Sequence, residues 1–376
     1  MSSEPTPLEI IIKDKIRTDG PITIAEYMSL CLGHEKYGYY QSQNIIGQSG
    51  DFTTAPEISQ LFGEILAAWV IDVWSKMGQP SKVHLVECGP GRGTLMDDIL
   101  RIAQKYSQFY DAVHITMLET SSLLIDKQKK KLQERIVQAK IQDKVTWVHN
   151  VSMISHTEPL IILGNEFLDA LPIHQYRFTD TGWKEKYIDL NKNDAFHYIE
   201  KSVKNEDLKL FPRSLLKPQL EDHLEVSHEA VNFMESLAKL MRNKQSIALF
   251  IDYGYVLPAY EATLQAVKTH RQADIFDTPG FCDLTAYVNF FHLSEIILNN
   301  NLMLFGPVSQ SHFLTQLGIE LRADQLIQNA STQEADEIKT ALRRLIGNDT
   351  HNNEMGDLFK VIAFTNDEAL KAEGFA

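Results

Sequence analysis

The 376-residue sequence has few cysteines, no excess of basic residues and no long apolar run, and each absence excludes a class of protein. Its three cysteines, Cys31, Cys88 and Cys282, are odd in number and widely separated. They predict neither a disulfide framework nor a zinc knuckle, and we expect no metal site. The sequence is therefore typical of a protein from a reducing compartment.

Acidic side chains outnumber basic ones by 50 to 36, which gives a formal net charge of −14. Such a charge repels a phosphate backbone, so nucleic acid is not expected as a partner. The basic run from Lys127 to Lys131 is more typical of the solvated face of a helix than of a nucleic-acid patch. A basic segment of another protein would suit the overall charge better.

No stretch is long and apolar enough to cross a bilayer, so we expect no membrane insertion. The N-terminal residues, with Glu4 and two prolines, do not match a secretory signal or an Arg-rich transit peptide. The length exceeds that of one ordinary domain, which predicts a main domain joined to a smaller unit. The oligomeric state stays open.

Residues 1–80 are predicted to form a mostly helical extension. Its clearest element begins at Thr54-Ala55-Pro56-Glu57, where the spacing predicts a capping box and a helix directly after it. From Ile58 to Val73, apolar residues recur at spacings of three and four, which predicts one broad buried face.

From Lys82 onward, short apolar runs alternate with helical periodicity, a pattern typical of an α/β protein with a parallel, doubly wound sheet. Residues 81–376 would form this Rossmann-like domain, interrupted by insertions at about 170–228 and 255–290. The first insertion should contain a β-hairpin with its turn at Thr181-Gly182. The runs expected to form strands of the sheet are Val83 to Cys88, Val113 to Leu118, Val145 to Val148, Leu160 to Leu163, Ser246 to Ile251 and Leu358 to Phe364.

The first of these strands leads into a glycine-rich turn and the start of a helix at Thr94. Glycines at Gly89, Gly91 and Gly93 let the backbone approach a ligand closely, and the N–H groups of a helix N-terminus attract carboxylates and phosphates. This arrangement predicts a cofactor site of the nucleotide type.

Two acidic residues favour S-adenosylmethionine (SAM) over NAD. The NAD fingerprint requires glycine at position 94, where this chain has Thr94. Glu87, at the end of the first strand, suits the ammonium group of SAM and would repel a pyrophosphate. Glu119, at the end of the second strand, can accept hydrogen bonds from both ribose hydroxyls, although an acid just before Ser121 is equally typical of a helix N-terminus.

Asn165, Glu166 and Asp169 follow the fourth strand, at the edge where open α/β sheets bind ligands. Glu166 and Asp169 are three residues apart, so a helical turn would bring both to one side, where they could hold a guanidinium. Fixing its plane would aim a nitrogen lone pair at the methyl group, and a carboxylate would take up the proton. The structural alternative is that Glu166 caps the next helix and Asp169 is solvated.

Two further pairs of residues are candidates for the same site. Asp252 and Tyr253 end the fifth strand and are expected to line the acceptor pocket, although an aromatic residue there is equally typical of the core. Asp51 and Thr53 could fold over the cofactor as a lid, although a plain loop before a helix explains them nearly as well.

Together these segments resemble the MidA-like family of SAM-dependent methyltransferases, which is related to a mitochondrial arginine methyltransferase that assists assembly of respiratory complex I. Tyr287, Asn289 and Cys88 depart from the family pattern, in which histidine, aspartate and leucine are common. The resemblance covers most of the chain and rests on Gly20-Pro21-Ile22, Gly38-Tyr39-Tyr40, the segment from Gly50 to Gln60, Glu87 to Leu95, Asn165 to Pro172, Ile251 to Tyr255, Thr263 to Ala266 and Asp283 to Ala286.

The resemblance implies a class I methyltransferase core of about seven strands with a helical N-terminal extension and inserted substrate-binding elements. It also implies an arginine of a protein substrate as acceptor, a complex I subunit as one candidate. The implied location is the cytoplasm in a bacterium, or the mitochondrial matrix after processing in a eukaryote. The alternatives are a non-catalytic assembly factor that keeps the SAM fold and binds a client protein, and an NAD-dependent oxidoreductase, which Glu87 and Thr94 disfavour.

Overall fold

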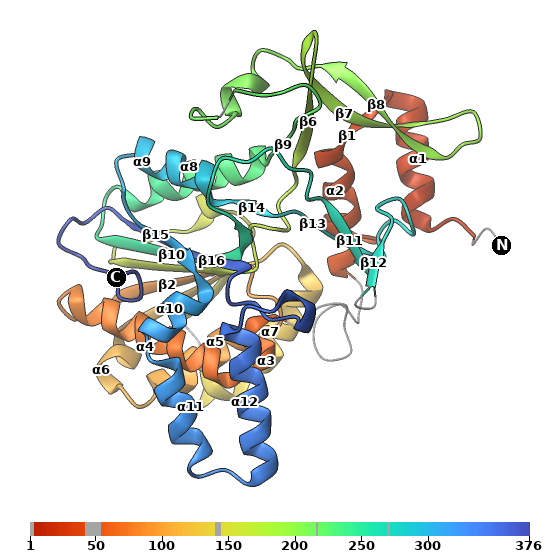
Figure 1. Cartoon of the computed structure of the whole chain (residues 1–376). Coiled ribbons are helices and arrows are strands. Elements are labelled where there is room, and N and C mark those ends of the chain that lie inside the picture. The colour runs from red at the N-terminus through yellow and green to blue at the C-terminus, as the bar shows by residue number, and fades with distance from the viewer. Residues whose placement is uncertain (1–3, 42–53, 140–143, 216, 269–270) are drawn as a thin grey trace.

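The computed structural model describes residues 4–41, 54–139, 144–215, 217–268 and 271–376 (Figure 1). Its main sheet has the strand order β15–β16–β10–β5–β2–β3–β4, and a short strand, β14, also pairs with β10. The strands from β4 to β10 are parallel, whereas β16 and β15 are antiparallel to their neighbours. The bounds are β2 Val83–Cys88, β3 Val113–Leu118, β4 Val145–Val148, β5 Leu160–Asn165, β10 Ser246–Tyr255, β14 Val288–Asn289, β15 Met303–Ser309 and β16 Phe359–Thr365.

All six strands expected for this sheet are present, which confirms the predicted α/β class. The edge strand β15 was not predicted from the sequence. It contains Gly306-Pro307, and its pairing with β16 shifts register between Phe305 and Val308. Proline cannot donate to a sheet ladder and is confined to edges and bulges, so this stretch lacks the strand signal that the inner strands carry.

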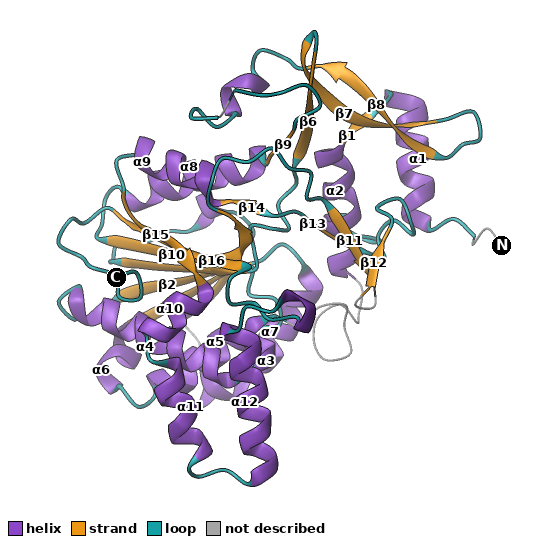
Figure 2. Ribbon diagram, in the orientation of Figure 1, coloured by secondary structure: helices purple, strands orange, loops and turns teal. Residues whose placement is uncertain are grey.

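Helices cover both faces of the sheet, giving three layers (Figure 2). Alternate residues of β2 enter different cores: Val83 and Leu85 pack towards α4 and α5, and Val86 and Cys88 towards α8 and α9. The bounds of the helices are α3 Ala55–Ile58, α4 Gln60–Lys76, α5 Thr94–Ala103, α6 Ser107–Ala112, α7 Ser122–Ala139, α8 His228–Met241, α9 Phe290–Asn299, α10 Gln310–Gln316, α11 Ile319–Ile327 and α12 Thr332–Ile346.

The capping box predicted at Thr54 is wrong. Thr54 makes no side-chain cap bond, and a four-residue helix, α3, ends at Ile58 before α4 begins. Ser59 caps α4 instead, through a hydrogen bond from Leu61 N to its Oγ. The carboxylate of Glu57 is engaged elsewhere, because it accepts a hydrogen bond from Thr94.

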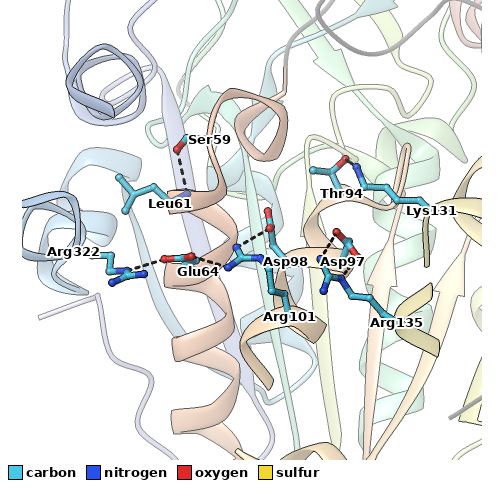
Figure 3. Close-up of polar contacts among 10 residues, drawn as sticks. All are labelled: Ser59, Leu61, Glu64, Thr94, Asp97, Asp98, Arg101, Lys131, Arg135 and Arg322. Carbon is cyan, nitrogen blue, oxygen red and sulfur yellow. Dashed lines mark hydrogen bonds and ion pairs between the residues drawn. The ribbon is translucent and has the colours of Figure 1, made fainter. Parts of the chain in front are cut away.

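Ion pairs join the helices on one face of the sheet (Figure 3). Glu64 of α4 accepts from Arg101 of α5 (2.8 Å) and from Arg322 of α11 (2.7 Å). Arg101 also donates to Asp98 (2.9 Å), which faces Gly63 so closely that a Cβ there would lie 2.5 Å from Asp98 Cβ. This network therefore fixes α4 and α11 against the helix that follows the glycine-rich turn.

A second group of elements packs beside the main sheet, at the upper right of Figure 1. It contains a sheet of order β1–β7–β6–β9, with β8 pairing to β7, and a sheet of order β12–β11–β13. The predicted hairpin is confirmed, but its turn residues are Asp180 and Thr181, because Gly182 already pairs with Thr179 as the first residue of β7. The bounds are α1 Pro7–Asp19, α2 Ile24–Gly33, β1 Ile22–Thr23, β6 His174–Thr179, β7 Gly182–Leu190, β8 Phe196–Ser202, β9 His223–Val226, β11 Gln265–Lys268, β12 Arg271–Ala273 and β13 Asp283–Thr285.

The N-terminal helices share one apolar core with these inserted strands. Leu8 and Ile12 of α1 and Tyr27 of α2 pack in the same cluster as Ile188 of β7 and Leu284 of β13. We propose that residues 1–80 form an extension of the methyltransferase domain. The core that α1 and α2 share with both insertions, and the packing of α4 on the main sheet, support this. In the described part of the chain, no helix is long and apolar enough to span a membrane.

Candidate active site

Three neighbouring parallel strands end at one edge of the sheet and bring the predicted site residues together there. Cys88 of β2 lies opposite Leu118 of β3 and Gly164 of β5, so the residues that follow them emerge side by side. Backbone bonds continue past the ladder, from Gly89 N to Leu118 O (3.0 Å) and from Glu119 N to Val148 O (2.9 Å).

The turn after β2 depends on glycine backbone geometry. Gly89, Gly91 and Gly93 have φ values of 64°, 53° and 80°, in the left-handed region that side chains rarely adopt. At Gly89 a Cβ would also lie 2.7 Å from the ring of Phe167, on the turn after β5. The cofactor-side turn and the acceptor-side turn are thus in direct contact.

Glu87 is a buried carboxylate that lacks a complete set of donors. Its side chain is 3% exposed, and its Oε2 atom has no hydrogen-bond partner among the described residues. Burial, with a smaller contribution from nearby Glu119, raises the pKa of Glu87 to about 8. A buried acid of this kind is costly unless a ligand supplies a cation or donors.

Glu119 is held by its own helix start and by the next helix. Its Oε1 accepts from the N–H groups of Thr120 (2.8 Å) and Ser121 (2.9 Å), and its Oε2 accepts from Gln128 of α7 (3.2 Å). Burial raises the pKa of Glu119, and these donors oppose that rise. Glu119 can therefore accept from the helix start through Oε1 and still bind a ligand through Oε2, so the two alternatives are compatible.

The turn after β5 places Asn165 and Glu166 in the cavity wall with an unusual backbone. Glu166 has φ 49°, which is uncommon for a residue with a side chain, and backbone strain of this kind clusters at active sites. Its Oε1 accepts from Ala55 N of α3 (2.8 Å) and from Asn165 Nδ2 (3.1 Å). Burial raises the pKa of Glu166 to about 7, and the carboxylate of Asp169 contributes to the rise.

Asp252 fixes this turn from behind. It is fully buried, and its Oδ2 accepts from the N–H groups of Phe167 (3.1 Å), Leu168 (2.8 Å) and Asp169 (3.2 Å). The next residue, Tyr253, donates its hydroxyl to Asp169 Oδ2 (2.6 Å). These contacts orient the acceptor-side carboxylates without requiring either residue of β10 to touch a ligand.

The short helix α3 bridges the two halves of the site. Ala55 N binds Glu166 on the acceptor side, and Glu57 Oε1 accepts from Thr94 Oγ1 (2.5 Å) on the cofactor side. Lys131 Nζ of α7 donates to the same hydroxyl (2.8 Å). The segment Thr54-Ala55-Pro56-Glu57, which was expected to form a capping box, is therefore part of the site.

These residues surround a cavity of about 570 Å³. Among the described residues, seven carboxylates line it against one guanidinium, that of Arg92. The carboxylates are Glu57, Glu87, Glu119, Glu166, Asp169, Glu229 and Asp283. Their excess creates a negative potential, which favours ligands that carry positive charge.

Most predicted site residues line this cavity, and some do not. The lining includes Glu87, Gly89, Gly91, Glu119, Asn165, Glu166 and Asp169. Gly93 lies behind the loop against Gln128, where it caps α5. Asp252 and Tyr253 are outside the described lining, because both are buried behind the turn they support. Asp51 and Thr53 lie outside the described residues.

Sequence reasoning missed several lining residues. Tyr39 and Tyr40, from the one-turn helix Tyr39–Gln41, and Asp283 of β13 belong to segments noted only for the family resemblance. From α8, Glu229, Asn232, Phe233 and Ser236 line the cavity. Their spacing of three and four is a helical signal, but only the tertiary fold shows which cavity that face meets.

The strand order, the glycine turn and the two acids at adjacent strand ends fit SAM. An unsatisfied buried carboxylate suits the ammonium end of the cofactor, and the left-handed glycines leave room where a Cβ would intrude. Among the described residues no cluster suited to a metal ion occurs. The fold and the site thus define a class I SAM-dependent methyltransferase.

Similarity to known proteins supports the assignment to the SAM-dependent methyltransferases. A family model of SAM-dependent methyltransferases matches residues 65–308, and the chain belongs to this family. A protein of Caenorhabditis elegans named protein arginine methyltransferase NDUFAF7 homolog, mitochondrial, is 34% identical over 93% of this chain and 84% of its own length. The Drosophila melanogaster protein of the same name is 33% identical over 94% and 83%, and the human protein arginine methyltransferase NDUFAF7 is 31% identical over 87% and 76%.

Solved structures show the same fold. A Burkholderia thailandensis protein crystallised with S-adenosylhomocysteine superposes with a TM-score of 0.80 at 24% identity, covering 99% of this chain and 96% of that one. A second structure from that organism, without the ligand in its description, gives 0.81 at 25% identity, covering 100% and 98%. The predicted fold, enzyme class and SAM cofactor are thereby confirmed.

Proposed function

We propose that this protein transfers a methyl group from SAM to a guanidinium nitrogen of an arginine in a protein substrate. The observation that carries the proposal is the buried turn that presents Asn165, Glu166 and Asp169 to the same cavity as Glu87. The relatives named as protein arginine methyltransferases support it, because they align with most of this chain.

On the cofactor side, Glu87 would bind the ammonium group and Glu119 the ribose, while Gly89 and Gly91 allow the backbone to approach. When bound, SAM supplies an electrophilic methyl group on its sulfonium. The side chains hold the charged and hydroxyl groups in place, so that the acceptor nitrogen meets the methyl group in one orientation. The negative cavity excludes anionic competitors and favours a sulfonium.

On the acceptor side, Glu166 and Asp169 would hold the guanidinium by charge-assisted hydrogen bonds. Asn165 Oδ1 is buried without a partner among the described residues, so it can accept an N–H of the attacking nitrogen. The carboxyl of Glu166, with a pKa of about 7, is suited to take up the proton that this nitrogen loses. Asp252 and Ala55 N hold the turn fixed during this exchange.

We propose that the protein partner is a subunit of respiratory complex I, which the family resemblance supports. The relatives are named mitochondrial proteins. We propose the mitochondrial matrix for this chain if its source is a eukaryote, and the cytoplasm if its source is a bacterium.

The test is transfer of labelled methyl from SAM to an extract of cells that lack the gene, followed by mass spectrometry of arginine residues. Wild-type protein should label arginine in few proteins, and Glu166→Gln should abolish labelling. Glu235→Gln, an exposed position on α8 outside the described cavity lining, is the matched control and should retain full activity. Labelling confined to other residue types would contradict the proposal. Full rescue of cells by Glu166→Gln would favour the assembly factor.

A further inference from the structure

Gln128 of α7 is a fully buried amide that touches both parts of the cofactor site. Its Nε2 donates to Gly91 O in the glycine turn (2.8 Å) and to Glu119 Oε2 (3.2 Å). Gly93 packs on its stem, since a Cβ at that glycine would lie 3.4 Å from Gln128 Cγ. The exposed fraction of Gln128 is 0%, so no solvent competes for these contacts.

Trp147 of β4 sets the orientation of the amide. The indole Nε1 donates to Gln128 Oε1 (2.9 Å), and an indole nitrogen can only donate. The amide oxygen must therefore face Trp147, and both hydrogens of Nε2 face Gly91 and Glu119. The reversed amide would place its oxygen against a carbonyl and a carboxylate and its NH₂ group against the indole N–H.

These contacts limit what Glu119 can still bind. A carboxylate has about four acceptor positions. Two on Oε1 are taken by Thr120 N and Ser121 N, and one on Oε2 is taken by Gln128. One position is left, which differs from the expectation that Glu119 accepts from both ribose hydroxyls.

We infer that Gln128 is a positioning residue, which couples the ribose-side carboxylate to the glycine turn and leaves Glu119 able to accept one ribose hydroxyl only. The inference rests on the proposed placement of Glu119 at the ribose. It extends the site to Gln128 and Trp147, two side chains outside the described cavity lining. Ligand selectivity at the ribose is then set by an amide and an indole.

The experiment is isothermal titration of the full chain with S-adenosylhomocysteine and with its 2′-deoxy and 3′-deoxy analogues. In the wild type, loss of one hydroxyl should weaken binding by about ten-fold, and loss of the other by less than about three-fold. Gln128→Leu should weaken binding of the parent ligand by about ten-fold and should bring the two analogues within about three-fold of each other. Gln133→Leu, at an exposed position of the same helix, is the matched control and should bind like the wild type.

Unchanged affinity in Gln128→Leu, or equal losses for the two analogues in the wild type, would overturn the inference. Glu119→Gln distinguishes a wrong placement of Glu119 from a wrong role of Gln128. If this variant binds like the wild type, the placement of Glu119 fails; if it binds weakly while Gln128→Leu does not, only the role of Gln128 fails. If Gln128→Leu does not fold, Trp147→Phe serves instead. That variant keeps a ring, frees the amide to reverse, and should also reduce the difference between the analogues; an unchanged difference would refute the inference.

Discussion

Binding of SAM should release a proton, because Glu87 is protonated in the ligand-free protein at neutral pH. Burial and Glu119 raise the pKa of this carboxyl to about 8. An ammonium ligand favours the carboxylate form, so the proton leaves when the ligand binds. The affinity should therefore rise with pH until Glu87 is ionised in the free protein, and should fall above the pKa of the ligand's amino group.

The magnitude follows from the two titrations. Below the pKa of Glu87, each pH unit changes the affinity about ten-fold. Taking an amino pKa of about 7.8, the affinity should increase by about 20-fold between pH 6 and pH 8 and should peak near pH 8. At pH 7 the net release should be about 0.8 proton, since the bound amino group takes up a small fraction.

Isothermal titration with SAM in buffers of different ionisation enthalpy measures both quantities. Glu87→Gln is the matched variant, because an amide of the same shape cannot titrate. It should bind about 100-fold more weakly at pH 8, and its affinity should be nearly flat from pH 6 to pH 7. A wild-type affinity that does not change between pH 6 and pH 8, or equal proton release by both proteins, would show that Glu87 does not lose a proton when SAM binds.

Three further perturbations test the same geometry. Glu87→Gln should stabilise the ligand-free protein at pH 7 by about 3 kcal/mol in denaturant titrations. Because the folded-state pKa of Glu87 is raised, the fold loses stability as pH rises from about 4.5 to 8, so the gain should vanish near pH 4. Tyr253→Phe should move the acid limb of the pH profile of kcat/KM upward, since its hydroxyl lowers the pKa of Asp169. Glu64→Gln should lower the free energy of unfolding by about 1 to 3 kcal/mol, because it weakens the bonds to two arginines.

Two of these variants have a matched control. The control for Tyr253→Phe is Tyr287→Phe, because the ring of Tyr287 lies 5.5 Å from that of Tyr253. An equal shift of the pH profile in the two variants would assign the effect to packing. For the ion-pair network the control is Lys339→Gln, which breaks an exposed pair with Asp336 and should not measurably change unfolding. A Glu64→Gln protein as stable as the wild type would show that the network contributes nothing. Equal stability of Glu87→Gln and the wild type at pH 7 would contradict the raised pKa.

The sequence predicted the parts of the fold whose signal is local. Strand β2, the glycine turn and the start of α5 are contiguous, and each contributes a recognisable residue type. Glu87 and Glu119 could be placed because parallel strands end at one edge, so their positions in the sequence determine their positions in space.

Residues that act across the fold could not be placed in this way. Asp252 has the residue type of a ligand-binding acid, yet its Oδ2 accepts from backbone N–H groups of the turn after β5 and its Oδ1 accepts from Tyr253 N. The positive φ of Glu166 and the bond from Ala55 N to its carboxylate also depend on tertiary contacts. Strand pattern and spacing carry no information about which donors a buried carboxylate receives.

The supply of donors separates the roles of the acids in the cavity. Glu119 receives three hydrogen bonds, which oppose the effect of burial on its pKa. Glu166 receives two, and its pKa lies near neutrality, where it can exchange a proton. Glu87 is left with an unsatisfied oxygen and has a higher pKa than Glu166. A buried carboxylate oxygen without a donor gains from binding a cationic ligand, and this supports the proposed placement of the ammonium group at Glu87.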